Sequence, residues 1–218
     1  MASSHSEAQH GKPGGKRPRG LVRAKLLDTA EQMFSKHGVQ GVSLREIAAA
    51  AGQGNVGAVN YYFKDRQGLV EALINDRVAV IEAGRQYLID AIADFGNCNT
   101  ERLLEIFWRP VIELCEQRQG TWFIQFHLQY LLLKEDAEHP FVTFPDHYPA
   151  SGSLLARLQA SSAHLSPPQF RHRLGLIFMI FWGALARYET DAAGQDWAND
   201  DPLAEPIKIA VASLAAPA

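Results

Sequence analysis

The stretch from Val42 to Phe63, VSLREIAAAAGQGNVGAVNYYF, carries the clearest structural signal in this chain of 218 residues. Ser43 and Glu46 have the spacing of a capping box, in which the serine hydroxyl accepts an N–H of the new helix and the glutamate accepts the serine N–H. Gly52 is expected to end this helix, and a second short helix is expected to run into the aromatic residues before Phe63. Two short helices joined by a Gly-containing turn are typical of small domains that place one helix in the DNA major groove.

Apolar residues on either side of this stretch recur at steps of three and four positions, the period of an amphipathic helix. The residues 139–149, HPFVTFPDHYP, contain three prolines and are expected to form a loop. No clear alternation of apolar and polar residues indicates a strand, so the sequence predicts an all-α fold. Outside the helix pair, helices are expected over about 21–37, 66–94, 100–117, 121–136, 151–164, 167–191 and 202–215.

The charges are divided unevenly along the chain. Residues 1–66 hold 10 Lys and Arg against 5 Asp and Glu, a balance of +5, whereas residues 67–218 hold 11 against 19, a balance of −8, which together give the net −3. A basic N-terminal segment followed by an acidic remainder indicates an N-terminal domain, here called the head, that binds a polyanion. The remaining domain, here called the body, is not expected to bind one. We therefore divide the chain into a flexible basic arm (1–19), a helix-turn-helix head (20–66) and a helical body (67–218).

The order of these motifs resembles the DNA-binding head of the tetracycline-repressor-like (TetR) family. This chain has one residue more than is usual for the family before the aromatic run, and we place it in the turn at 53–57. The resemblance implies a homodimeric repressor on a palindromic operator, released when a small molecule enters the helical body. The residues that carry it are Ala30, Phe34, Gly38, Ser43, Leu44, Ile47, Ala48, Ala51, Gly52, Asn60, Tyr61, Tyr62, Phe63, Arg66 and Leu69.

Double-stranded DNA is the expected partner of the head. The start of the second short helix inserts deepest in such heads, so Asn55, Val56 and Gly57 are candidates for contacts to base edges. Asn60 can pair with adenine or reach a phosphate. One of the two tyrosines should pack in the core and the other should donate its hydroxyl to a phosphate. Tyr61 is the preferred DNA contact, whereas Tyr62 could either pack in the core or bind a phosphate. The expected DNA-binding residues are Ser43, Arg45, Asn55, Val56, Gly57, Asn60, Tyr61, Tyr62, Lys64 and Arg66.

The body is rich in aromatic residues at helical spacings, which could line a pocket for an apolar or aromatic effector or could simply form a core. The apolar segment 174–186 must be covered on both sides, and Ile207, Ala210, Val211 and Leu214 make a matching stripe. We therefore expect a homodimer through the two C-terminal helices. The candidate pocket residues are Trp108, Trp122, Phe123, Phe126, His127, Tyr130, Phe178 and Trp182.

Several classes of protein are not supported by the sequence. No nucleophile, zinc or P-loop motif occurs, and the glycines at 52–57 follow a helix rather than the strand that a dinucleotide site requires. The Pro-rich loop contains His139, Asp146 and His147, and nothing in the sequence places these side chains together. We therefore expect that the protein binds no metal ion. We also expect that it binds no cofactor and is not an enzyme. The chain has two cysteines, Cys98 and Cys115, too few for a disulfide framework, which favours a reducing compartment. No apolar run is long enough to span a membrane. We therefore expect a cytoplasmic protein. An all-α interaction module without DNA binding and a transcriptional activator are the alternatives.

Overall fold

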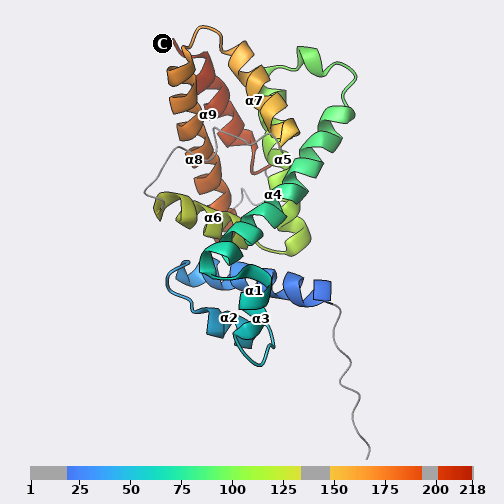
Figure 1. The fold of residues 1–218 in the computed structure, drawn as a ribbon. Coiled ribbons are helices and arrows are strands. Elements are labelled where there is room, and N and C mark those ends of the chain that lie inside the picture. The colour runs from blue at the N-terminus through green and yellow to red at the C-terminus, as the bar shows by residue number, and fades with distance from the viewer. Residues whose placement is uncertain (1–18, 134–147, 193–200, 218) are drawn as a thin grey trace, which may run out of the picture.

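The computed structural model describes residues 19–133, 148–192 and 201–217, and within these ranges every regular element is a helix. The prediction of an all-α fold is therefore confirmed. The head contains α1 (Arg19–His37), α2 (Leu44–Ala50) and α3 (Gly57–Phe63), and α4 (Arg66–Asp90) leads from the head into the body (Figure 1). The body contains the short 3-10 helix η1 (Phe95–Asn97), α5 (Thr100–Arg118), α6 (Trp122–Leu133), α7 (Pro149–Ser161), α8 (Pro167–Ala192) and α9 (Ala204–Ala215).

The core of the head forms because each of its helices turns one apolar stripe inward. Phe34 of α1, Ile47 of α2 and Val59 of α3 have no exposed side-chain surface, and Phe63 is almost as deeply buried. Gly38 ends α1 with a φ of 73°, a left-handed conformation that glycine adopts without steric cost. In Figure 1 these three helices form a small unit at the lower end of the molecule.

The fourth helix is shorter than the sequence predicts, because it ends at Asp90 rather than near Asp94. Asp94 instead organises a turn: its backbone carbonyl accepts the N–H of Asn97 at 3.2 Å, and its carboxylate accepts the Asn97 side-chain amide at 2.6 Å. Aspartate and asparagine stabilise such turns at the expense of helix. The chain therefore turns here and enters α5.

The head and body meet where α1 packs against α6. The rings of Phe34 and Phe126 stack with centroids 5.8 Å apart, and the Gln129 side-chain amide donates to the Ser35 carbonyl at 2.9 Å. Phe126 was expected in an effector pocket, but the structure places it at this joint between head and body.

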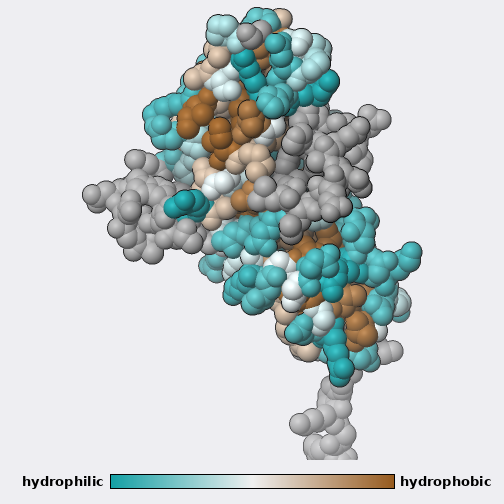
Figure 2. Space-filling model, turned by 90° about the vertical axis from the view of Figure 1, so that its left-hand side faces the viewer, coloured by the Kyte–Doolittle hydropathy of each residue, from teal (hydrophilic) through white to brown (hydrophobic). Residues whose placement is uncertain are grey.

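The last two described helices, α8 and α9, pack against each other within one chain. Ile207, Ala210 and Leu214 are buried within the one chain and so expose no surface to a second copy, and the expected dimer through these two helices stays a prediction. The outward faces instead expose Leu176, Ile180 and Ile209. Figure 2, which faces the α8 side of the molecule, shows an apolar area in its upper half.

Two expectations fall partly outside the described residues. The helix expected to reach residue 136 is described to Leu133, and the loop expected over 139–149 is described from Tyr148, with Pro149 already the first residue of α7. His139, Asp146 and His147 lie outside the described ranges. Among the residues that the structure does describe, no helix is both long and apolar enough to cross a membrane.

Candidate nucleic-acid interface

The predicted capping box at the start of α2 is confirmed. Ser43 has extended backbone, its hydroxyl accepts the Glu46 N–H at 3.2 Å, and the Glu46 carboxylate accepts the Ser43 N–H at 2.8 Å. The hydrogen bonds from Ser43 lower the pKa of the Glu46 carboxyl. Both residues are exposed, and so is Arg45 between them. This end of α2 therefore exposes a capped helix N-terminus and the guanidinium of Arg45 to solvent.

The turn between α2 and α3 is a Schellman motif. The Gln53 N–H donates to the Ala48 carbonyl at 2.8 Å and the Gly52 N–H to the Ala49 carbonyl at 2.9 Å, with Gly52 at a φ of 71°. Asn55 then accepts the Gly57 N–H on its side-chain oxygen at 2.8 Å, which directs the chain into α3.

The turn runs over residues 51–56, and α3 begins only at Gly57. Asn55 and Val56 therefore precede the helix rather than occupying its start. Asn55 remains exposed, whereas Val56 is half-buried and packs against the core of the head. Val56 is consequently less accessible to a base edge than the sequence suggested.

The short helix α3 has a buried face and an exposed face. Val59 and Phe63 lie in the core, while Asn60 is exposed and the Tyr61 side chain is 68% exposed. The Tyr61 ring stands edge-on to the Tyr62 ring, with centroids 5.0 Å apart. The outward face thus offers an amide and a phenol from adjacent positions, both of which are common DNA contacts.

Two of the expected DNA-binding residues are engaged within the protein. The Tyr62 hydroxyl donates to the Arg19 carbonyl at 3.1 Å, which holds the start of α1 beside α3. The Arg66 guanidinium donates to the carbonyls of Val39 and Val42 in the loop between α1 and α2. Both residues therefore stabilise the head, and this leaves Tyr61 as the more accessible of the two tyrosines.

Lys64 follows α3 in an uncommon backbone conformation. Its φ of 69° and ψ of −59°, together with the 2.8 Å hydrogen bond from the Asp65 N–H to the Phe63 carbonyl, define a γ-turn with positive φ. For a residue with a side chain this conformation is strained, and such strain is concentrated at functional sites. The turn holds an exposed lysine directly after the outward face of α3.

Two acidic residues of α1 are paired away from this face. Asp28 and Glu31 of α1 form ion pairs with Arg77 of α4 and Arg118 of α5. This cluster was not predicted from the sequence, although Glu31 lies four positions after buried Leu27 and three before buried Phe34, on the inner face of its helix. Asp28 and Glu31 therefore do not offset the charges of Arg45 and Lys64, whereas the exposed Glu46 and Asp65 lie next to those two residues in sequence.

The structure brings only some of the predicted effector-pocket residues together. Trp108 stacks on Phe181 with centroids 4.5 Å apart, and Phe178 and Trp182 meet it edge-on at 5.4 Å. Phe123 and His127 join this cluster through Trp182. Trp122 lies against Gly120, and Tyr130 packs on Phe126 at the head–body joint.

Most of this aromatic cluster is buried, as a core would be. Burial lowers the pKa of His127 to about 3, so its imidazole is neutral at physiological pH. A cavity of about 150 Å³ at the turn between α5 and α6 is lined by Ile112, Cys115, Glu116, Gln119, Gly120, Thr121, Ile124 and Leu185. None of these eight residues was among the predicted pocket residues.

Residues 26–73 match the family described as bacterial regulatory proteins, tetR family. A protein of Bacillus subtilis (strain 168), named as probable HTH-type transcriptional regulator YttP, is 32% identical over 104 residues, which are 47% of this chain and 48% of that protein. The chain thus matches about half the length of this curated relative. The family and the relative are regulators rather than enzymes, in agreement with the sequence analysis.

Two solved structures are similar to most of the chain at low identity. A TetR-family regulator from Streptomyces coelicolor A3 has a TM-score of 0.48 and 16% identity, over 93% of this chain and all of the other. The reduced form of Escherichia coli NemR has the same TM-score and 15% identity, over 89% of this chain and 95% of the other. The N-terminal segment 26–73, which contains α2, α3 and the capping box described above, is the part of this chain that matches the tetR family of bacterial regulatory proteins.

Proposed function

We propose that this protein is a homodimeric transcriptional repressor that binds a palindromic operator in the cytoplasm and is released by a small apolar or aromatic effector. The observation that carries the proposal is the outward face of α3, where Asn60 and the 68% exposed Tyr61 stand on a helix anchored by buried Val59 and Phe63. An exposed phenol beside an exposed amide offers hydrogen-bonding groups of the kind that bind phosphates and base edges.

The exposed residues divide into two roles in this proposal. Asn60, with Gly57 at the helix start and Asn55 just before the helix, faces base edges, and the Asn60 amide suits adenine. Ser43, Arg45, Tyr61 and Lys64 bind phosphates, which fixes the position of the head on the duplex but reads no sequence. Tyr62 and Arg66 support this surface from behind, through the Arg19, Val39 and Val42 carbonyls.

The test is a fluorescence-anisotropy titration on the DNA that flanks the coding gene, over a range of salt concentrations. Tyr61→Ala should weaken binding by about tenfold or more at every salt concentration and leave the log–log salt slope unchanged, because a neutral phenol binds a phosphate without releasing a counterion. Tyr87→Ala is the matched control, because Tyr87 is a tyrosine on α4 with 74% exposure that lies outside the head. Absence of DNA binding at every salt concentration would instead favour an interaction module, and increased transcription on binding would favour an activator.

The dimer proposal is supported by the outward face of α8 and α9. Leu176 and Ile180 are one helical turn apart and 54% and 37% exposed, and Ile209 of α9 is 48% exposed. A side chain added at Gly183 would meet nothing within 4 Å, so a second copy can approach the α8 backbone closely there. Covering these apolar side chains would remove them from water, which is the main driving force for association.

Sedimentation equilibrium tests this interface. Ile180→Glu should raise the dimer dissociation constant by about thirtyfold or more, since loss of a central interface contact costs about 2 kcal/mol. Val80→Glu, at a 46% exposed apolar position on α4, should leave the dissociation constant unchanged. Equal effects of the two substitutions, or a wild-type protein that is monomeric at micromolar concentration, would contradict the proposed interface.

The effector proposal rests on the aromatic cluster around Trp108. Trp108 is 1% exposed, and its indole N–H has no hydrogen-bond partner among the described residues. A buried donor of this kind favours an aromatic effector with one hydrogen-bond acceptor, such as a carbonyl or phenol oxygen. A thermal-shift screen of aromatic compounds should select acceptor-bearing ones. Trp108→Phe should weaken their binding by about tenfold, the equivalent of one net hydrogen bond.

A further inference from the structure

The side chain of Asn55 lies where a side chain of Gly57 would stand. A Cβ added at Gly57 would be 2.7 Å from the Asn55 Oδ1 and 3.7 Å from its Cγ. Gly57, Asn60 and Tyr61 follow each other at steps of three and one on α3 and are all exposed, so they share one side of that helix. The Asn55 carboxamide therefore joins this outward face, although Asn55 itself precedes the helix.

One hydrogen bond fixes which way the Asn55 carboxamide is turned. The Gly57 N–H donates to the Asn55 side-chain oxygen at 2.8 Å. A backbone N–H can donate to the oxygen of a carboxamide but not to its NH₂ group, so the oxygen is the end held against the Gly57 backbone. The exposed Asn55 side chain therefore offers a partner the two N–H donors of its amide nitrogen.

The side chain of Asn60, further along α3, is not restrained in this way. It is exposed, and no hydrogen bond joins it to another described residue. Adenine presents an acceptor beside a donor in the major groove, and a carboxamide matches this pair when both its oxygen and its nitrogen are available. Asn60 meets that condition, whereas Asn55 does not. The two asparagines of the outward face therefore suit different bases.

Guanine is the base that matches a pair of donors. Its edge in the major groove carries two acceptors, N7 and O6, and no donor. Adenine and thymine each offer one acceptor, and cytosine offers a donor, which cannot bind the amide N–H groups of Asn55. At the position that Asn55 faces, guanine is therefore the best base and cytosine the worst.

We propose that Asn55 is a specificity-determining residue that selects guanine at one position in each half of the operator. This inference rests on the proposed function, because it requires the head to bind duplex DNA through the outward face of α3. It adds the base that Asn55 reads. It also gives a reason for glycine at position 57, since a glycine leaves room for the Asn55 oxygen.

The test is selection of binding sites by the full chain from a library of DNA duplexes of random sequence, followed by sequencing of the bound duplexes. The wild type should enrich a palindromic site with guanine at a fixed position in each half. Asn55→Asp keeps an oxygen for the Gly57 N–H but replaces the two donors by an acceptor. That position should therefore change from guanine to cytosine, whose amino group donates to carboxylates. Each protein should prefer its own base by about tenfold.

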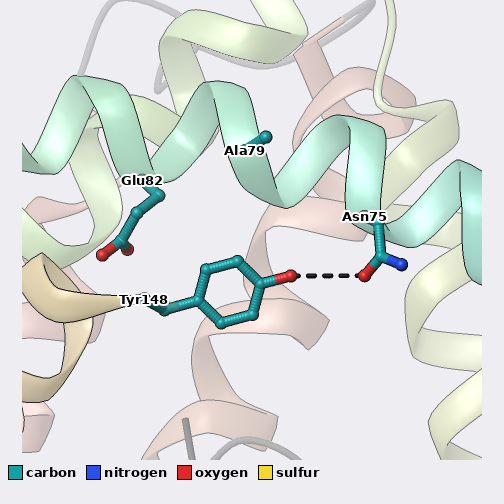
Figure 3. Close-up of a pocket in the computed structure, with 4 residues that line it drawn as sticks. All are labelled: Asn75, Ala79, Glu82 and Tyr148. Carbon is teal, nitrogen blue, oxygen red and sulfur yellow. Dashed lines mark hydrogen bonds between the residues drawn. The ribbon is translucent and has the colours of Figure 1, made fainter. Parts of the chain in front are cut away.

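Asn75→Asp is the matched control. Asn75 is an exposed asparagine of α4, and its side-chain oxygen also accepts a hydrogen bond within the protein, from the Tyr148 hydroxyl at 3.2 Å (Figure 3). Because Asn75 lies in the body, the same substitution there should leave every selected base unchanged. A change of selected base in Asn75→Asp would attribute the effect to added negative charge and overturn the proposal.

Gly57→Ala displaces the Asn55 amide without removing it. The added methyl group would meet the Asn55 oxygen, and the end of a side chain can move aside without unfolding the head. The preference for guanine over cytosine should therefore be lost in this variant, although Asn55 is still present. Retention of the full preference would show that the position of the amide does not matter and would contradict the proposal.

A modified base tests the contact from the side of the DNA. In the duplex that the wild type selects, 7-deazaguanine in place of the guanine removes the N7 acceptor. Wild-type binding should weaken by about fivefold, the equivalent of one net hydrogen bond, whereas binding by Asn55→Asp should not change. Unchanged wild-type binding would overturn the proposal.

The outcomes separate this assignment from the proposed function. If Asn55→Asp enriches the same bases as the wild type and only binds all sequences more weakly, Asn55 contacts a phosphate, and the assignment fails while DNA binding stands. If the wild type enriches no sequence from the library, the proposed function fails and the assignment fails with it.

Discussion

Arg77 of α4 and Glu31 of α1 form a buried, two-pronged ion pair between helices 46 residues apart in sequence. The Arg77 Nε donates to one carboxylate oxygen at 3.0 Å and a terminal nitrogen donates to the other at 3.1 Å. Glu31 has no exposed surface, and Arg118 at the end of α5 donates to the same carboxylate. One glutamate of the head is thus held by two arginines that belong to the helices of the body.

Removal of that carboxylate charge should destabilise the protein strongly. Glu31→Gln leaves Arg77 buried with a weaker acceptor in place of the carboxylate, and breaking a buried pair from one side costs about 3 kcal/mol. The free energy of unfolding in urea should fall by that amount. Glu205→Gln, which breaks an exposed pair with Lys208 on α9, should have no measurable effect. Similar stability of the two variants would show that Glu31 is not essential to the joint.

Two glycine substitutions should have opposite effects. A Cβ added at Gly84 of α4 would lie 2.8 Å from the Cβ of Pro110 in α5, and the rigid proline ring cannot move aside cheaply. Gly84→Ala should therefore lower the free energy of unfolding by about 1–3 kcal/mol. Gly152→Ala on α7, where nothing lies within 4 Å, should raise it by up to about 1 kcal/mol because alanine favours the helix. Thermal unfolding measures both, and a stabilising Gly84→Ala would refute the close α4–α5 approach.

The buried His127 should make stability depend on pH. Burial lowers the pKa of His127 to about 3, whereas an exposed histidine titrates near pH 6.5 in the unfolded chain. The unfolded state therefore takes up this proton first, and the free energy of unfolding decreases as the pH falls from about 6.5 towards 3. Between pH 7 and pH 5 this contribution is about 2 kcal/mol.

Urea unfolding of His127→Phe at pH 7 and pH 5 measures that contribution. The variant should lose less stability than the wild type between the two pH values, while His172→Gln, at an exposed position on α8, should behave like the wild type. The same pH dependence in all three proteins would mean that His127 is protonated as readily in the folded protein as in the unfolded one.

Lys64 should contribute to DNA binding at a cost in stability. Lys64→Gly removes the strain of its γ-turn and should raise the free energy of unfolding by about 1 kcal/mol. The same change removes one phosphate contact from each subunit, two in the proposed homodimer, and should lower the salt slope of DNA binding by about 1.8. Lys64→Ala separates the two effects: DNA affinity should fall equally, but without the gain in stability. Unchanged affinity in both variants would remove Lys64 from the interface.

Arg66 should act on stability rather than on DNA contacts. Arg66→Lys keeps the positive charge but cannot hold the Val39 and Val42 carbonyls together, because lysine lacks the forked guanidinium. The free energy of unfolding should fall by about 2 kcal/mol, the usual loss for a hydrogen bond to a charged group. The salt slope of DNA binding should stay the same. A lower slope with unchanged stability would restore Arg66 to the DNA-binding surface.

The sequence by itself determined the local features of the head. The capping box of Ser43 and Glu46, the helix stop at Gly52 and the separation of Asn60 and Tyr61 from Val59 and Phe63 all depend on residues within a few positions of one another. Short-range hydrogen bonds and helical periodicity fix such features before any long-range contact forms. The all-α fold follows from the same periodicity.

Only the tertiary structure decided which side chains are used by distant partners. Arg66 and Tyr62 look like DNA contacts in sequence, but carbonyls 24 to 43 residues away engage them. The aromatic residues of α6 divide between a joint with α1 and a cluster with α8, and Ile207 and Leu214 are covered by their own chain. The spacing of residues along a helix determines on which side of that helix a side chain lies. Which other helix the side chain then contacts depends on how all the helices of the chain pack together.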